Sequence, residues 1–87
     1  MSVTLQLTYE MSKALGVPRL ELDGPETVAD VVRTVESRFG DAGADFAKLT
    51  RVTAIAVNGV LVNYRRGMKT RLGEGDVVAF VKAAAGG

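Results

Sequence analysis

The sequence predicts an α+β fold in which one main helix packs on one face of a mixed sheet of four to five strands. Three patterns predict it: strict alternation of apolar and polar residues at 3–9, an amphipathic helical stripe at 28–39, and an apolar run of strand length at 77–81. A chain of 87 residues suffices for one small domain with a single core. We expect the domain to span residues 1–82 and residues 83–87 to form a C-terminal tail.

Two strands are predicted in the N-terminal part of the chain. The alternation at residues 3–9 has period 2, which is typical of a half-buried strand. A loop is expected to continue through residues 13–16, and Leu20 and Leu22 then alternate with charged residues in a second short strand. The apolar face of the first strand is predicted to hold Val3, Leu5, Leu7 and Tyr9.

The helix is predicted to begin after Thr27. The Thr27 hydroxyl can accept a hydrogen bond from the backbone N–H of Asp30, and Asp30 occupies the acidic position of a capping box. Gly40 is expected to end the helix. One apolar stripe faces the core, and it comprises Val28, Val31, Val32, Val35 and Phe39.

The second half of the chain predicts a loop and then a hairpin. Residues 40–50 are expected to form the loop, with Phe46 and Leu49 as apolar anchors. Asn58-Gly59 then separates apolar runs at 53–57 and 60–62. Because both turn residues tolerate positive φ, this dipeptide is the strongest short signal for a hairpin.

The last predicted strand, at residues 77–81 with Lys82 as an alternative end, follows a basic loop at 64–72 and a turn at 73–76. It is nearly all apolar, so we expect it to lie centrally and to be buried on both faces. A right-handed crossover would place it parallel to the first strand, which gives the ubiquitin-like β-grasp arrangement. The predicted core comprises Val3, Leu5, Leu7, Val28, Val31, Val32, Val35, Ile55, Val57, Val77 and Phe80.

The composition excludes several kinds of chemistry. The chain contains no cysteine, which excludes disulfides, thiolate metal sites and a cysteine nucleophile. It contains no histidine, the commonest general base and metal ligand. No segment has the ~20 apolar residues that span a bilayer, and no signal-peptide pattern opens the chain. We therefore expect a cytoplasmic protein that does not interact with membranes.

Charge is distributed unevenly although the net charge is only +1. Residues 1–47 carry four basic and eight acidic groups, whereas residues 48–87 carry seven basic and two acidic groups. The basic excess is concentrated at Arg65, Arg66, Lys69 and Arg71. This cluster could bind nucleic acid, form a solvated loop or dock an acidic partner protein; with Tyr64 as the only aromatic residue beside it, nucleic acid is the less favoured interpretation.

The chain ends in Ala83-Ala84-Ala85-Gly86-Gly87. A terminal glycine pair places the α-carboxylate on a segment with almost no side chains, so the carboxylate can enter a narrow active site on another protein. Chance occurrence and a flexible end of no function are the competing explanations. We expect residues from Ala83 onward to be extended or mobile in the free protein, because they lack large apolar side chains.

Four features of the chain together resemble one family, the MoaD/ThiS group of ubiquitin-like sulfur carriers, also represented by the small subunit of molybdopterin synthase. The Gly-Asp turn, the strand and the terminal glycine pair form the most specific of the four. The matching segments are Ala14-Leu15-Gly16-Val17, Thr27-Val28-Ala29-Asp30, Val57-Asn58-Gly59, and Leu72-Gly73-Glu74-Gly75-Asp76-Val77-Val78-Ala79-Phe80 leading to Gly86-Gly87.

The resemblance implies a carrier without catalytic side chains of its own. A ubiquitin-activating-type enzyme would adenylate the Gly87 carboxylate with ATP and Mg²⁺, and a sulfurtransferase or sulfide would convert it to a thiocarboxylate. A synthase subunit would then accept the sulfur, and the pathway that the resemblance implies is molybdopterin synthesis. No cofactor would be bound by the carrier itself. We expect the tail residues Ala84, Ala85 and Gly86 to enter the partner's channel. We expect docking to involve Phe80, Val81, Arg65 and Arg66.

Two further functions stay open at this point. A ubiquitin-like protein modifier would share the adenylation step but would end with Gly87 in an isopeptide bond to a lysine. An interaction module with an incidental tail would instead bind through the basic cluster. The sequence does not separate the first alternative from the carrier, because the activated end is identical.

Overall fold

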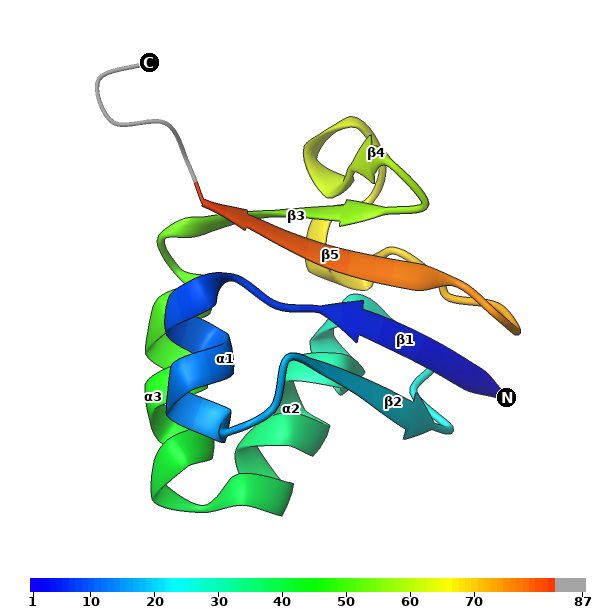
Figure 1. The fold of residues 1–87 in the computed structure, drawn as a ribbon. Helices are drawn as coiled ribbons and strands as arrows, with labels where there is room; N and C mark the ends of the chain where they lie inside the picture. The colour runs from blue at the N-terminus through cyan, green and yellow to red at the C-terminus, as the bar shows by residue number, and fades with distance from the viewer. Residues whose placement is uncertain (83–87) are drawn as a thin grey trace.

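The structure is a computed structural model and describes residues 1–82 (Figure 1). The strands are β1 (Ser2–Gln6), β2 (Arg19–Asp23), β3 (Thr53–Val57), β4 (Val60–Leu61) and β5 (Val77–Lys82). The helices are α1 (Tyr9–Leu15), α2 (Val28–Phe39) and α3 (Asp41–Thr50), and two 3₁₀ turns, η1 (Val62–Tyr64) and η2 (Gly67–Lys69), follow β4. None of the helices in residues 1–82 is long and apolar enough to cross a bilayer.

The strands form one mixed sheet in the order β2-β1-β5-β3-β4. β5 is parallel to β1 and antiparallel to β3, with Val78 opposite both Leu5 and Val57. The predicted central position of the last strand and its parallel pairing with the first are therefore confirmed. Asn58 and Gly59 have φ angles of 50° and 85°, as the predicted hairpin between β3 and β4 requires.

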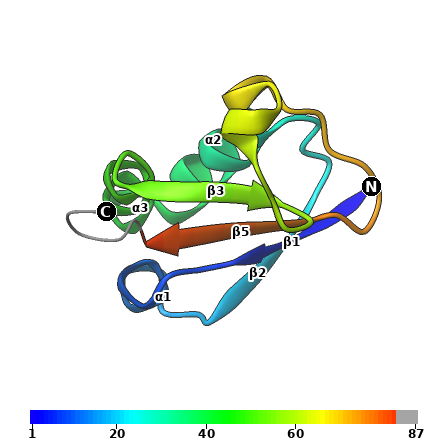
Figure 2. The same cartoon turned by 90° about the horizontal axis from the view of Figure 1, so that it is seen from above.

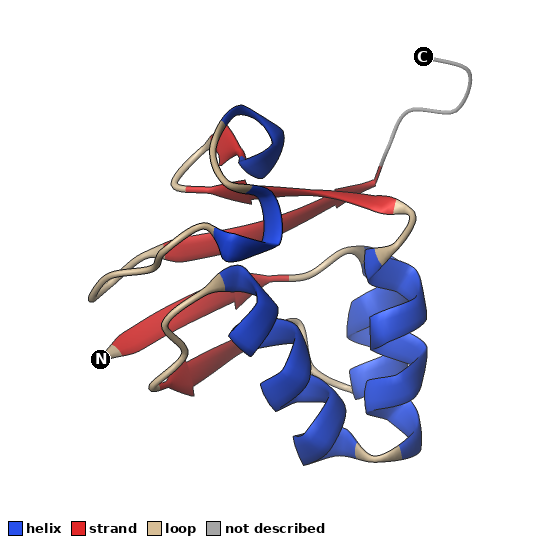
Figure 3. Ribbon diagram, turned by 180° about the vertical axis from the view of Figure 1, so that it is seen from behind, coloured by secondary structure: helices blue, strands red, loops and turns tan. Residues whose placement is uncertain are grey.

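The main helix α2 lies across one face of the sheet, with α3 alongside it, and α1 packs against α3 at the end of the sheet (Figures 2 and 3). The predicted start of α2 is confirmed: Asp30 N donates to Thr27 Oγ1 at 3.2 Å, and Thr27 N donates to Asp30 Oδ2 at 3.1 Å. Desolvation opposes ionisation of Asp30, but hydrogen bonds from Glu26, Thr27 and Arg33 outweigh it and lower the pKa below 3.8.

Two predicted loops are in fact helices. The first strand ends at Gln6 rather than Tyr9, because the Thr8 hydroxyl accepts from Met11 N at 3.2 Å and caps α1. Met11 and Leu15, one turn apart, are the buried residues of α1. Tyr9, predicted to face the core, consequently starts a helix and is 75% exposed.

The predicted loop at residues 40–50 is helix α3, whose apolar residues Ala42, Phe46 and Leu49 recur at helical spacing. Gly43, which disfavours a helix in isolation, lies where α3 meets α2. A Cβ added at Gly43 would lie 2.5 Å from the carbonyl oxygen of Glu36, so only glycine permits this approach. The two anchors were predicted correctly: Phe46 is fully buried and Leu49 packs against the core.

The core agrees with most of the predicted residues, but the last strand is buried on one face only. Val78, not Val77, faces the core, because a shift of one residue reverses the face to which a strand residue points. Leu7 and Val32 are partly buried at the edge of the core. Phe80 is 4% exposed, and its ring meets that of Phe46 edge to face at a centroid distance of 5.3 Å.

The sheet face opposite the helices is uncovered by any helix of residues 1–82. Its central part is small and apolar, since register and alternation place Ala54 and Ala56 of β3 beside Val81 and Ala79 of β5. β4 is shorter than predicted, because Val62 turns inward and starts η1.

Candidate functional site

The described part of the chain ends at Lys82, the last residue of the central strand β5 and the one that precedes the predicted tail. Ala84, Ala85, Gly86 and Gly87, the predicted tail and sulfur-carrying residues, lie outside the described residues. β5 is paired with β1 over residues 77–79 and with β3 from Val78 to Lys82, which lies opposite Thr53, so β3 fixes the position of its end relative to the rest of the domain. The surroundings of Lys82 therefore define what a protein that captures the tail would meet first.

Lys82 lies at the rim of a hollow where α1 begins and α3 ends. Its Nζ is 3.6 Å from Glu10 Oε2. The hollow has a volume of about 240 Å³ and is lined by Thr8, Glu10, Leu49, Val52, Thr53 and Lys82. We call these six residues the tail root. The sequence did not predict this group, because a loop was predicted where α1 lies. The signal for α1 was the spacing of Met11 and Leu15, which are one helical turn apart.

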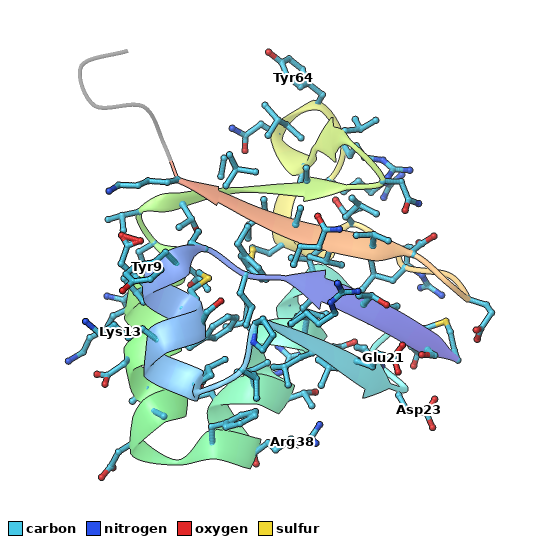
Figure 4. The ribbon with its side chains drawn as sticks, in the orientation of Figure 1. Tyr9, Lys13, Glu21, Asp23, Arg38 and Tyr64 are labelled. Atoms are coloured by element: carbon cyan, nitrogen blue, oxygen red, sulfur yellow. The ribbon has the colours of Figure 1, made fainter. Side chains whose placement is uncertain are left out.

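The predicted docking residues Phe80 and Val81 point to opposite faces of the sheet. Phe80 belongs to the core, so its ring is not available to a partner unless the core opens. Val81 is 49% exposed on the helix-free face, and Tyr9 and Val52 are exposed apolar residues near the same end of the sheet. Figure 4 shows Tyr9 at the start of α1, below the end of β5. Of the predicted pair, Val81 is thus the residue at the surface.

Arg65 and Arg66, the other predicted docking residues, lie in the segment between β4 and β5. Together with Tyr64, Thr70 and Arg71 they line a second hollow of about 370 Å³. Neither Phe80 nor Val81 lines this hollow, so it does not bring the two pairs of predicted docking residues together. Lys69, the fourth basic residue of the cluster, is exposed outside this lining.

The tail root brings together groups suited to contact with another protein. At the tail root, the charged pair of Lys82 and Glu10 borders aliphatic and hydroxyl side chains. Such a surface can orient a partner protein against the strand that carries the tail. The reacting carboxylate itself would be that of Gly87, on the segment that follows.

Comparison with known proteins adds a family match. The model of the ThiS family matches residues 10–87, a range that includes β5 and the terminal glycine pair. A search of curated proteins finds no match.

Several solved structures share the fold over nearly their whole length. A chain of the BexX/CysO complex from Amycolatopsis orientalis is 27% identical, with a TM-score of 0.78 and coverage of 98% of this chain and 99% of that chain. Small archaeal modifier protein 1 from Methanosarcina acetivorans is 22% identical, with a TM-score of 0.74 and coverage of 99% and 96%. A chain of the complex of subunits 1 and 2 of molybdopterin-converting factor from Helicobacter pylori is 17% identical, with a TM-score of 0.67 and coverage of 100% of both chains. At the two lower identities the likeness shows a shared fold.

Proposed function

Since the chain belongs to the ThiS family of ubiquitin-like sulfur carriers, we propose that it carries sulfur as a thiocarboxylate on Gly87. The observation that supports this most strongly is the extent of the family match, which continues through β5 to the last glycine. On this proposal the protein is a carrier and not an enzyme, and residues 83–87 are a tail that enters the active sites of partners.

The proposed chemistry has two steps, and both take place on an activating enzyme of the ubiquitin-activating type. A terminal carboxyl group has a pKa of about 3.3–3.7, so Gly87 presents a carboxylate at neutral pH. One of its oxygens attacks the α-phosphorus of ATP, whose negative charge Mg²⁺ offsets on the enzyme, and pyrophosphate leaves. Sulfide, or a persulfide on a sulfurtransferase, then attacks the carbonyl carbon and displaces AMP. Attack by a persulfide gives an acyl disulfide between Gly87 and the sulfurtransferase. A second thiol of the partner then attacks the sulfurtransferase sulfur of that bond, which forms a disulfide between the two thiols and releases the thiocarboxylate.

Glycine at positions 86 and 87 supports this chemistry. Without a Cβ, the backbone enters a narrow channel and adopts extended or positive-φ conformations, and the carbonyl carbon stays open to the sulfur nucleophile. The chain has no cysteine, so the terminal carboxyl is the group on which transferred sulfur would reside. The carrier requires no bound cofactor, and we propose that it works in the cytoplasm, where ATP is available.

The tail root and Val81 fit the role of a surface that partners recognise. They surround the exit of β5, and a partner that contacts them gains a fixed starting point for the residues that follow. Both the activating enzyme and the sulfur-accepting synthase subunit would use this region in turn. We propose molybdopterin synthesis as the first accepting pathway to test, in view of the shared fold with the molybdopterin-converting factor chain.

A second function shares the first step. The fold is also that of small archaeal modifier protein 1, so Gly87 would in this alternative form an isopeptide bond with a lysine of another protein. The two functions differ in the nucleophile that displaces AMP, a sulfur atom for the carrier and a lysine amine for the modifier.

Intact mass spectrometry tests the proposal. The chain is incubated with the activating enzyme of its own host, ATP, Mg²⁺ and a sulfide donor, and the variant without Gly87 serves as control. A carrier gains the mass difference between sulfur and oxygen, and only in the full chain. If the chain keeps its mass while Gly-Gly remnants appear on lysines of host proteins, the modifier function replaces the carrier function.

A further inference from the structure

The basic segment between β4 and β5 carries a concentration of positive charge, of which the charge of Arg65 also acts on the Asp76 carboxylate. Arg65, Arg66, Lys69 and Arg71 are all exposed, and none of them forms an ion pair with a carboxylate of residues 1–82. Other basic side chains do find partners within the domain, for example Arg33 with Asp30. The charge of the segment is therefore available to a carboxylate or phosphate from another molecule.

This segment is also held in place by the domain rather than free to adapt. Thr70 is 3% exposed, and its hydroxyl accepts a hydrogen bond from Arg66 N at 3.2 Å. The backbone on either side of Arg71 is bonded to the start of the main helix: Val28 N donates to Thr70 O at 3.2 Å, and Leu72 N donates to Glu26 O at 2.9 Å. Ligand groups would thus meet a preformed surface, which lowers the entropy cost of binding.

Three arginines share one hollow in this segment. Arg65, Arg66 and Arg71 line a space of about 370 Å³ together with Tyr64 and Thr70, and no carboxylate lines it. Each guanidinium presents a planar fork of donors that matches a carboxylate. The volume accommodates a few side chains of a partner, not a folded domain.

Exposed apolar side chains lie close to the arginines in the sequence, and one of them, Tyr64, lines the same hollow. Val60, Leu61 and Met68 are partly exposed, and Tyr64 is 82% exposed. Figure 4 shows Tyr64 projecting away from the body of the domain at the turn that follows β4. Tyrosine, methionine and arginine are the residue types enriched in protein interfaces, and an exposed group of them beside a charged hollow is typical of a docking site.

We propose that this basic hollow docks an acidic segment of a partner protein. Aspartate or glutamate carboxylates of that segment would lie between Arg65, Arg66 and Arg71, and its apolar side chains would cover Tyr64 and Met68. A nucleic acid fits less well, because single-stranded binding needs a series of aromatic platforms and the described surface offers Tyr64 beside aliphatic residues. The site is distinct from the tail root, so this inference does not depend on sulfur transfer.

Titration of the isotope-labelled protein with a blocked peptide of alternating glutamate and leucine tests the docking site. We expect amide shifts confined to residues 60–72, and affinity that falls as salt is added. Arg66→Glu should weaken binding about tenfold or more, whereas Arg19→Glu, which makes the same change of charge at an exposed site on β2, should weaken it by less than about twofold. Tyr64→Ala should weaken binding without altering its salt dependence.

Three results would overturn the proposal. The first is a loss of affinity in Arg19→Glu equal to that in Arg66→Glu, which would mean that net charge alone attracts the peptide. The second is a set of shifts that map outside the hollow or are absent. The third is tighter binding of oligouridylate of equal charge than of the peptide, which would make the site one for nucleic acid. Both variants are checked for unchanged melting temperature, so that a folding defect is not mistaken for lost binding.

Discussion

Asn58 and Asp76 lock the β3–β4 turn onto the start of β5. Asn58 Nδ2 donates to Asp76 Oδ1 at 2.9 Å, and Asn58 Oδ1 accepts from Val77 N at 3.0 Å. The other carboxylate oxygen of Asp76 accepts from Gly73 N at 2.7 Å. Two turns that lie 18 residues apart in the sequence are thereby joined at the point where the central strand begins.

We expect this pair to be coupled energetically. Asn58→Ala and Asp76→Ala should each lower the free energy of unfolding by about 1–2 kcal/mol, because each removes a hydrogen bond to a charged or backbone group. The double variant should cost less than the sum of the two, as a double-mutant cycle by urea unfolding would show. Asp45→Ala, an exposed position on α3, serves as control and should change stability by less than about 0.5 kcal/mol. Strictly additive costs would contradict the coupling.

Acid should weaken the same connection. The hydrogen bond from Asn58, the hydrogen bond from Gly73 and the positive charge of Arg65 hold the pKa of Asp76 below 3.8. A group with a lowered pKa in the folded state stabilises the fold above its unfolded pKa and loses that contribution as pH falls through the folded value. The urea midpoint should therefore fall as pH drops below about 3.8, and the decline should be smaller in Asp76→Ala. NMR titration of Asp76 giving a pKa above 3.8 would contradict this.

Gly43 is expected to be the least replaceable glycine within a helix. Gly43→Ala places a Cβ 2.5 Å from Glu36 O and 2.7 Å from Val35 O, so α2 and α3 must separate. Overpacking of this kind costs about 1–3 kcal/mol in spite of the higher helix propensity of alanine. Gly73→Ala is the matched control, because its Cβ would meet only Asp76 Oδ2 at 3.8 Å. A Gly43→Ala variant as stable as wild type would show that α2 and α3 lie further apart.

Phe80 and Val81 should have separable roles despite being adjacent. Phe80→Ala should lower the free energy of unfolding by about 3–5 kcal/mol, since it opens a cavity beside Phe46. Val81→Ala should change stability by less than about 0.5 kcal/mol but weaken binding to the activating enzyme, measured by calorimetry. Val81→Ala with wild-type affinity would remove Val81 from the proposed docking surface.

Local signals in the sequence predicted the parts of the fold that depend on local chemistry. Thr27 and Asp30 marked the start of α2, because a capping box is complete within four residues. Asn58-Gly59 marked the turn between β3 and β4, because these two residue types readily adopt the positive φ angles that the turn requires. The apolar content of β5 likewise predicted its central place in the sheet.

Features that depend on distant partners were not predictable in the same way. A loop was predicted over residues 40–50, and the reason for a glycine at position 43 of a helix becomes visible only when α2 lies against it. The apolar run at 77–81 did not say which of Val77 and Val78 faces the core, because both are valine and the register is set by pairing with β1. The tail root was missed because it joins residues from three separate segments.

ATP–pyrophosphate exchange by the activating enzyme tests the central claim most directly. The enzyme is given the full chain, the variant without Gly87, or Gly86→Trp. We predict that both variants lose exchange while their melting temperatures stay close to wild type, because residues 83–87 contain only alanine and glycine. A displacement of about 1 Å at the reacting carboxylate suffices for a loss of about 100-fold. Exchange at the normal rate by the chain without Gly87 would contradict both the carrier function and the modifier function.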